Sequence, residues 1–147
     1  MKVCVAQRYN APPERVFDAW LDPAVAGAWL FATASRPLAR VEIDRRVGGT
    51  FQMLDRPGVG GTVYTGKYLE IVPPRRLVFT LSMANGPRAV IRTRVTAEIV
   101  PLASGCEVRL THEDVPRELA SRTEGRWTGV LYGLGDRLRA RTAPQLP

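Results

Sequence analysis

Residue types that build catalytic or metal sites are scarce in this chain. Its 147 residues include one histidine, His112, and two cysteines, Cys4 and Cys106. A structural zinc site takes four nitrogen or sulfur ligands at close spacing, and these three side chains fall short of that. The sequence also holds no Ser-His-Asp order, Walker loop or GxGxxG element. We therefore predict no metal and no cofactor, and a binding domain is favoured over an enzyme.

Long apolar runs are also missing. No stretch approaches the ~20 apolar residues that a membrane helix needs. The first residues lack the long apolar segment of a secretory signal. We expect a cytoplasmic protein without a membrane span, whose cysteines stay reduced as small buried side chains.

Positive charge is plentiful but dispersed. The formal net charge is +7, and lysine occurs only at Lys2 and Lys67, so arginine supplies nearly all of it. The arginines form only short clusters, such as Arg45–Arg46 and Arg75–Arg76. Nucleic-acid-binding proteins usually concentrate basic residues on one element and interleave aromatic ones. The pattern indicates a solvated surface and predicts no specific nucleic-acid partner.

Alternation of apolar and polar residues predicts a series of strands. They are expected at residues 2–9, 41–45, 50–54, 63–72, 76–83, 89–100 and 106–113. Two short helices should follow the first strand, with Asn10 and Asp22 as their N-caps. Gly48–Gly49 is a hairpin turn, and residues 36–40, 57–61 and 85–87 are expected to be loops or turns.

The period changes after Pro116, where apolar residues recur every three or four positions until about Arg141. This predicts one long amphipathic helix. Hairpin strands flanked by helices indicate an α+β domain. We expect a single domain over residues 1–141, with a short tail at 142–147.

A sheet of six or seven strands curls, and its concave face has to be covered. The long helix is the only element available to cover it, so an apolar cavity is expected between the two. Side chains that would face this cavity are Trp29, Phe51, Met53, Leu81, Met83, Val95, Leu110, His112, Trp127, Leu131 and Leu134. The alternative, equally open, is that these side chains fill the space completely.

His112 is the candidate acid or base of this set. It shares a strand face with Val108 and Leu110, so it is expected to point inward. Its neighbours Glu107 and Glu113 have the opposite parity and cannot assist it. A hydrogen-bonding or structural role is therefore favoured over catalysis.

The last helix carries glycines at residues 125, 129 and 133. They lie opposite Trp127 on a helical wheel, and each lowers helix stability by about 1 kcal/mol relative to alanine. Such a face could let the helix shift, or it could receive a partner chain together with Tyr132. A homodimer is therefore one possibility. The other is that these glycines have no function and the protein tolerates the loss of helix stability.

Six segments, in order, resemble one family. They are NAPPERVFDAWLDP (10–23), Trp29, VEIDRRVGGTF (41–51), GKYLEIVPPRRLVFTLS (66–82), VRLTHEDVP (108–116) and GRWTGVLYGL (125–134). The chain is similar to the activator-of-heat-shock-protein-90-ATPase homologue branch of the START-like (SRPBCC, Bet v 1-like) superfamily. The family often has two adjacent tryptophans after the second helix. Here Trp29 is followed by Leu30 and Phe31, which predicts a different pocket mouth.

The resemblance implies a helix-grip fold with a ligand cavity between the sheet and the last helix. The expected function is non-catalytic binding of a hydrophobic or aromatic small molecule or lipid. A polyketide cyclase or aromatase using the same pocket is one alternative, and a chaperone-associated stress-response protein is another. In this fold the first and last strands pair antiparallel, which puts Cys4 and Cys106 roughly 20 Å apart. A disulfide needs Cα atoms within ~7 Å, so two free thiols are predicted.

Overall fold

A computed structural model describes residues 1–31, 40–55, 61–84 and 91–142. The elements in chain order are β1 (Val3–Tyr9), α1 (Pro13–Leu21), α2 (Pro23–Trp29), β2 (Arg40–Ile43), β3 (Thr50–Leu54), β4 (Val63–Val72), β5 (Arg76–Ala84), β6 (Ile91–Pro101), β7 (Cys106–Glu113), a 3-10 turn (Arg117–Leu119) and α3 (Ala120–Thr142). The loop expected from residue 36, most of the turn at 57–61, the turn at 85–87, the start of the strand expected at 89 and the tail from 143 lie outside the described residues.

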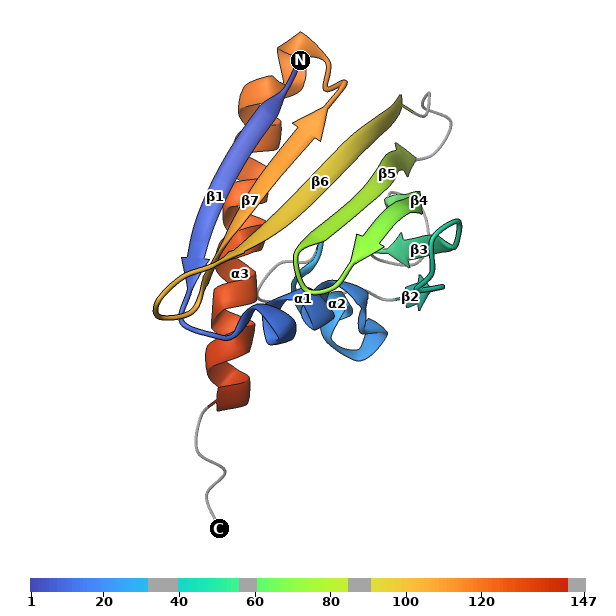
Figure 1. The fold of residues 1–147 in the computed structure, drawn as a ribbon. Coiled ribbons are helices and arrows are strands. Elements are labelled where there is room, and N and C mark those ends of the chain that lie inside the picture. Colours follow the sequence, from blue (N-terminus) through green and yellow to red (C-terminus); the bar gives the residue numbers. More distant parts are fainter. Residues whose placement is uncertain (32–39, 56–60, 85–90, 143–147) are drawn as a thin grey trace.

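The strands form one antiparallel sheet in the order β1-β7-β6-β5-β4-β3-β2. Because β1 pairs with β7, the first and last strands are neighbours and the remaining strands follow as hairpins. Figure 1 shows α3 crossing behind one face of this sheet, with α1 and α2 at its lower end. This is the predicted helix-grip α+β architecture.

The helix boundaries show which capping predictions hold. Asp22 caps α2, because its side chain accepts a hydrogen bond from the backbone N–H of Ala24 at 3.0 Å. The prediction for Asn10 was wrong, since α1 has Pro12 as its N-cap and no side-chain cap. Pro12 and Pro13 instead set the backbone for the first turn, where a missing N–H does no harm.

Hydrogen bonds between distant elements hold α3 in place. The hydroxyl of Tyr9 on β1 donates to the carbonyl of Leu131 at 2.6 Å, and Arg15 on α1 donates to the carbonyl of Leu138, also at 2.6 Å. Burial raises the pKa of the Tyr9 hydroxyl, so it remains a donor. The helix is thereby attached near its middle and near its C-terminal end.

The register of β1 against β7 settles the cysteine question. Tyr9 is opposite Cys106, whereas Cys4 is opposite Thr111 at the other end of the pair. Both thiols are free, Cys4 on the surface and Cys106 fully buried. The prediction of two free thiols is confirmed, but the expectation that both are buried was wrong for Cys4, which lies on the exposed face of β1.

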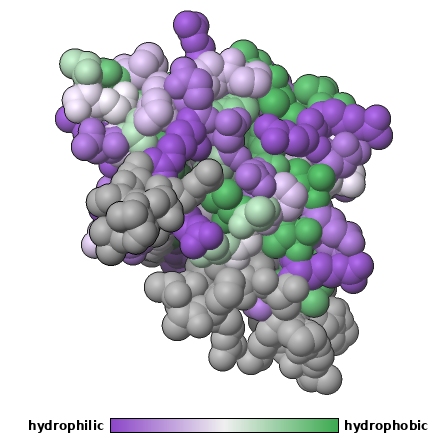
Figure 2. Space-filling view, turned by 90° about the horizontal axis from the view of Figure 1, so that it is seen from below, coloured by the Kyte–Doolittle hydropathy of each residue, from purple (hydrophilic) through white to green (hydrophobic). Residues whose placement is uncertain are grey.

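The surface is mixed in character. Figure 2 views the molecule from the end where α1 and α2 lie, and hydrophobic side chains there form small groups separated by hydrophilic ones. In the part of the chain that the structure describes, no helix is both long and apolar enough to cross a membrane.

Candidate functional site

A chain of hydrogen bonds links the sheet to α3 through His112. Trp127 on α3 donates its Nε1 hydrogen to Nδ1 of His112 at 3.0 Å. Nε2 of His112 lies 2.6 Å from Oγ1 of Thr93 on β6, and that hydroxyl donates to the carbonyl of Leu81 on β5 at 3.0 Å. These hydrogen bonds connect β5, β6, β7 and α3 through an otherwise apolar interior.

The partners fix the protonation state of His112. An indole nitrogen can only donate, so Nδ1 of His112 accepts and the ring hydrogen sits on Nε2. Nε2 then donates to the Thr93 hydroxyl, whose own hydrogen goes to Leu81. Burial lowers the pKa of His112 to about 4, so the ring is neutral at physiological pH. Both nitrogens are occupied, which makes His112 a structural bridge rather than a free base.

Ten of the eleven side chains predicted to face the cavity are buried. They are Trp29, Phe51, Met53, Leu81, Val95, Leu110, His112, Trp127, Leu131 and Leu134. Met83 is the exception, with 43% of its surface exposed. It has the parity of Leu81, but it lies next to the last residue of β5, where packing against the other elements ends.

Large side chains occupy almost all the space between the sheet and α3. A small hollow of about 10 Å³ lies beside this space, among side chains of α1, the C-cap of α2 and strands β3 to β5. Its walls are Trp20, Leu30, Phe51, Met53, Tyr68, Leu77 and Phe79. Of the two alternatives that the sequence leaves open, the filled interior is the one observed.

Phe31 closes this interior, and the sequence pattern gave it no role beyond a change at the pocket mouth. It follows the C-cap of α2 and has a φ of 58°, in the left-handed region that glycine usually occupies there. Its ring stacks on Tyr64 with centroids 4.5 Å apart and planes 3° from parallel. It also contacts Trp127 at 5.8 Å between ring centroids. The signal in the sequence was Phe31 itself, a bulky residue two positions after the helix end.

Arg126 covers the outer side of this stack. Its guanidinium carbon lies 5.3 Å from the centroid of the Tyr64 ring, and its Nη2 donates to the Tyr64 hydroxyl. Burial raises the pKa of Tyr64 despite the nearby positive charge.

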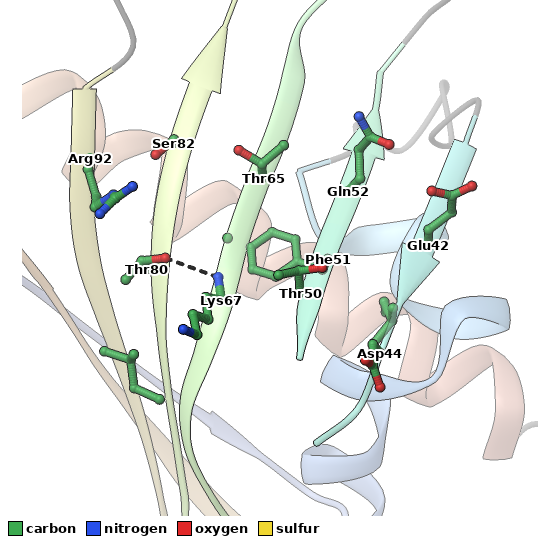
Figure 3. A pocket seen from close by; sticks show the side chains of 13 residues that line it. Glu42, Asp44, Thr50, Phe51, Gln52, Thr65, Lys67, Thr80, Ser82 and Arg92 are labelled. Atoms are coloured by element: carbon green, nitrogen blue, oxygen red, sulfur yellow. Dashed lines mark hydrogen bonds between the residues drawn. The ribbon is translucent and has the colours of Figure 1, made fainter. Parts of the chain in front are cut away.

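A larger hollow lies on the opposite, outer face of the sheet. It measures about 950 Å³ and contains Thr65, Lys67, Thr80, Ser82 and Arg92 among its lining residues. Figure 3 shows their side chains pointing off strands β4 to β6 into open space, with Thr80 between Arg92 and Lys67. In the register, Thr65, Ser82 and Arg92 form one row across three strands. This polar row is typical of the solvated face of an antiparallel sheet.

The two hollows share one wall, the ring of Phe51. The ring packs under Gly66, where an added Cβ would overlap both it and the carbonyl oxygen of Thr80. Phe51 therefore borders both the outer hollow and the interior. Because it is open and polar, it is not the apolar site that the sequence predicts.

Acidic, histidine and cysteine side chains do not gather anywhere in the described ranges in a group that could hold a metal ion. Glu107 and Glu113 lie on the outer face and make ion pairs, Glu107 with Arg8 and Arg109, Glu113 with Lys2 and Arg94. No carboxylate therefore stands beside His112 in the part of the chain described.

A curved antiparallel sheet around a long C-terminal helix, with an aromatic interior, defines a helix-grip domain of the START-like superfamily. Residues 10–139 match the model of the family "Activator of Hsp90 ATPase homolog 1-like protein", and the chain belongs to this family. No curated protein matches the sequence.

Solved structures share the fold over nearly the whole chain. Protein CV1439 from Chromobacterium violaceum is 27% identical with a TM-score of 0.77, over 92% of this chain and 96% of that one. An AHSA1-like protein from Aeromonas hydrophila is 22% identical with a TM-score of 0.79, over 100% and 98%. DynU16, a protein in the dynemicin biosynthetic locus, is 18% identical with a TM-score of 0.72, over 94% of this chain and 47% of that one.

Proposed function

We propose that this chain binds an apolar, aromatic small molecule between the sheet and α3, and that the ligand enters by displacing Phe31. The observation that carries the proposal is the backbone of Phe31, a non-glycine residue with a φ of 58° whose ring stacks on Tyr64 and contacts Trp127. Strain of this kind often marks positions that move in function. The aromatic walls favour a ring-shaped ligand over a lipid chain, because rings gain from offset and edge contacts.

The energetics make such an opening accessible. Exposing the Phe31 side chain loses about 1.5–3 kcal/mol of burial, and the lost ring contacts with Tyr64 and Trp127 add about 1–3 kcal/mol. Releasing the left-handed backbone returns about 1–3 kcal/mol. The open state therefore lies no more than about 5 kcal/mol above the closed one, which corresponds to a population of about 0.02% or more. A ligand that binds only the open state can shift this balance.

The role of Phe31 is tested by association rates with 9-fluorenone as the probe, followed by quenching of tryptophan fluorescence in stopped flow. Phe31→Gly relieves the backbone and removes the ring, so we expect association at least about tenfold faster. The matched control is Asp114→Gly, because Asp114 also has a positive φ, of 65°, but lies on the surface at the end of β7. Equal rates in the wild type and Phe31→Gly would remove Phe31 from the entry route.

An enzyme of the polyketide cyclase or aromatase kind is less well supported. Such an enzyme needs polar groups that converge on the substrate, and the two nitrogens of His112 are already bonded to Trp127 and Thr93. The likeness to DynU16 concerns the fold alone. A reaction abolished by His112→Ala in a protein that remains folded would reverse this preference.

A chaperone-associated role in the stress response rests on the family description and on the outer face of α3. Tyr132 there is 61% exposed, and Cβ atoms added at Gly125, Gly129 and Gly133 would meet nothing within 4 Å. Homodimerisation through this face and a cytoplasmic location also stay predictions. Pull-down of heat-shock protein 90 by the wild type, lost in Tyr132→Glu, would support the chaperone role.

A further inference from the structure

Trp20 differs from the other two tryptophans in its hydrogen bonding. Nε1 of Trp29 donates to the carbonyl of Ala19 at 3.1 Å, and Nε1 of Trp127 donates to His112. Nε1 of Trp20 has no partner, although only 1% of the residue is exposed. It is the one buried side-chain nitrogen or oxygen in this state within the described residues. A buried donor left unpaired lowers stability by about 1–3 kcal/mol, so its retention needs a reason.

The surroundings of Trp20 are aromatic and almost without polar groups. Its ring meets Trp29 edge-on at 4.8 Å between centroids and lies 6.3 Å from Trp127 and 6.4 Å from Phe79. Trp20 also forms part of the wall of the 10 Å³ internal hollow. A buried water needs about this much room and two to four polar partners. Tyr68 is the only other residue of that wall with a polar side chain, so a water would be poorly held.

We infer that the ligand of this interior is an uncharged aromatic molecule with a hydrogen-bond acceptor, such as a carbonyl oxygen, that pairs with Nε1 of Trp20. This inference rests on the proposed function and adds the chemical class of the ligand to it. The ligand is uncharged because the wall around Trp20 carries no charged side chain and burying an unpaired charge is unfavourable. The acceptor is required because an indole N–H offers only a donor. Displacement of Phe31 would open the interior to the ligand, and the hydrogen bond to Trp20 would favour ligands that carry an acceptor.

Two probes of nearly the same shape test this selection. Fluorene and 9-fluorenone differ by a methylene group against a carbonyl group, and their dissociation constants can be measured by calorimetry on the full chain. One hydrogen bond satisfied at a buried donor predicts about tenfold tighter binding of fluorenone. In Trp20→Phe the preference should fall to about one. Trp29→Phe is the matched control and should keep the preference, because the N–H it removes is already bonded to Ala19.

A second readout needs no substitution. In a ¹H–¹⁵N correlation spectrum, the indole N–H signal of Trp20 should move downfield with fluorenone and much less with fluorene. Equal affinity for the two probes would overturn the acceptor while leaving aromatic binding intact. A preference that survives Trp20→Phe would overturn the pairing of the acceptor with Trp20. If neither probe binds and no indole signal moves, the proposed function itself fails, and the ligand class fails with it.

Discussion

The Nε2 atom of His112 and the Oγ1 atom of Thr93 lie 2.6 Å apart in the interior, on neighbouring strands. The contact makes sense only with a neutral imidazole, because Nδ1 already accepts from Trp127. Protonation of His112 at Nδ1 would point the new N–H at the indole N–H of Trp127, so that two donors would face each other. Protonation of His112 should therefore destabilise the folded protein.

The free energy of unfolding should decrease as the pH drops between the unfolded-state and folded-state pKa values of His112. In the unfolded chain its pKa is about 6.5, and burial lowers the pKa to about 4 in the folded protein. Between these values the unfolded state binds more protons, so the free energy of unfolding decreases as pH drops from about 6.5 to about 4, by roughly 3 kcal/mol in all. Urea unfolding of the wild type and His112→Gln at several pH values isolates the effect. Their difference in stability should shrink on acidification, and a constant difference would contradict the neutral bridge.

Removing the Thr93 hydroxyl should destabilise the protein by about 1–3 kcal/mol. Thr93→Val keeps the shape of the side chain but leaves the Nε2 hydrogen of His112 without an acceptor. Thr96→Val is a suitable control, because Thr96 is equally buried on the same strand and its hydroxyl takes no part in the His112 chain. Urea unfolding measures both variants. Equal losses of stability would show that the hydrogen bond between His112 and Thr93 contributes no more than an ordinary buried hydroxyl.

Two glycines should respond to alanine in opposite directions. Gly66→Ala puts a Cβ into the Phe51 ring and the Thr80 carbonyl, so we expect a loss of about 1–3 kcal/mol. Gly129→Ala meets open space on α3 and should raise the free energy of unfolding by up to about 1 kcal/mol. Thermal unfolding measures both. A loss of stability in Gly129→Ala would mean that the glycine face of α3 is needed by the folded monomer.

The two thiols should differ sharply in reactivity. Cys4 is exposed, whereas Cys106 is fully buried and burial raises the pKa of its thiol. A chromogenic disulfide reagent should therefore modify about one thiol per chain in the native state and about two in denaturant. Cys4→Ser should abolish the rapid native reaction. Similar rates at both cysteines would contradict the packing of β7 against the core.

Strand and helix periodicity was enough to predict the order of elements, since each strand alternates faces and α3 repeats every three to four residues. Parity also placed His112 inside and Glu107 and Glu113 outside. It could not decide whether the interior was open, because that depends on how ring volumes interlock across the sheet and α3. Phe31 and Trp20, which we propose admit and bind the ligand, were not singled out from the sequence for a related reason. A left-handed backbone and an unpaired N–H are properties of the packed structure, and neither leaves a period in the sequence.

The predictions for Met83 and Asn10, which rest on strand parity and on capping preference, were both wrong. Met83 follows the inward parity of its strand, yet parity does not say how far the covering layer extends along β5. Asn10 is a good capping residue, but two prolines after it place the helix start beyond its reach. In both cases the neighbouring elements decide the outcome.

The ¹H–¹⁵N spectrum of the three tryptophan indoles during a titration with 9-fluorenone tests the central claim most directly. The account predicts saturable shifts of the Trp20 and Trp127 signals, with little change at the backbone amides of Lys67 and Arg92 on the outer face of the sheet. Shifts confined to Lys67 and Arg92, with the indole signals unmoved at saturation, would contradict binding between the sheet and α3.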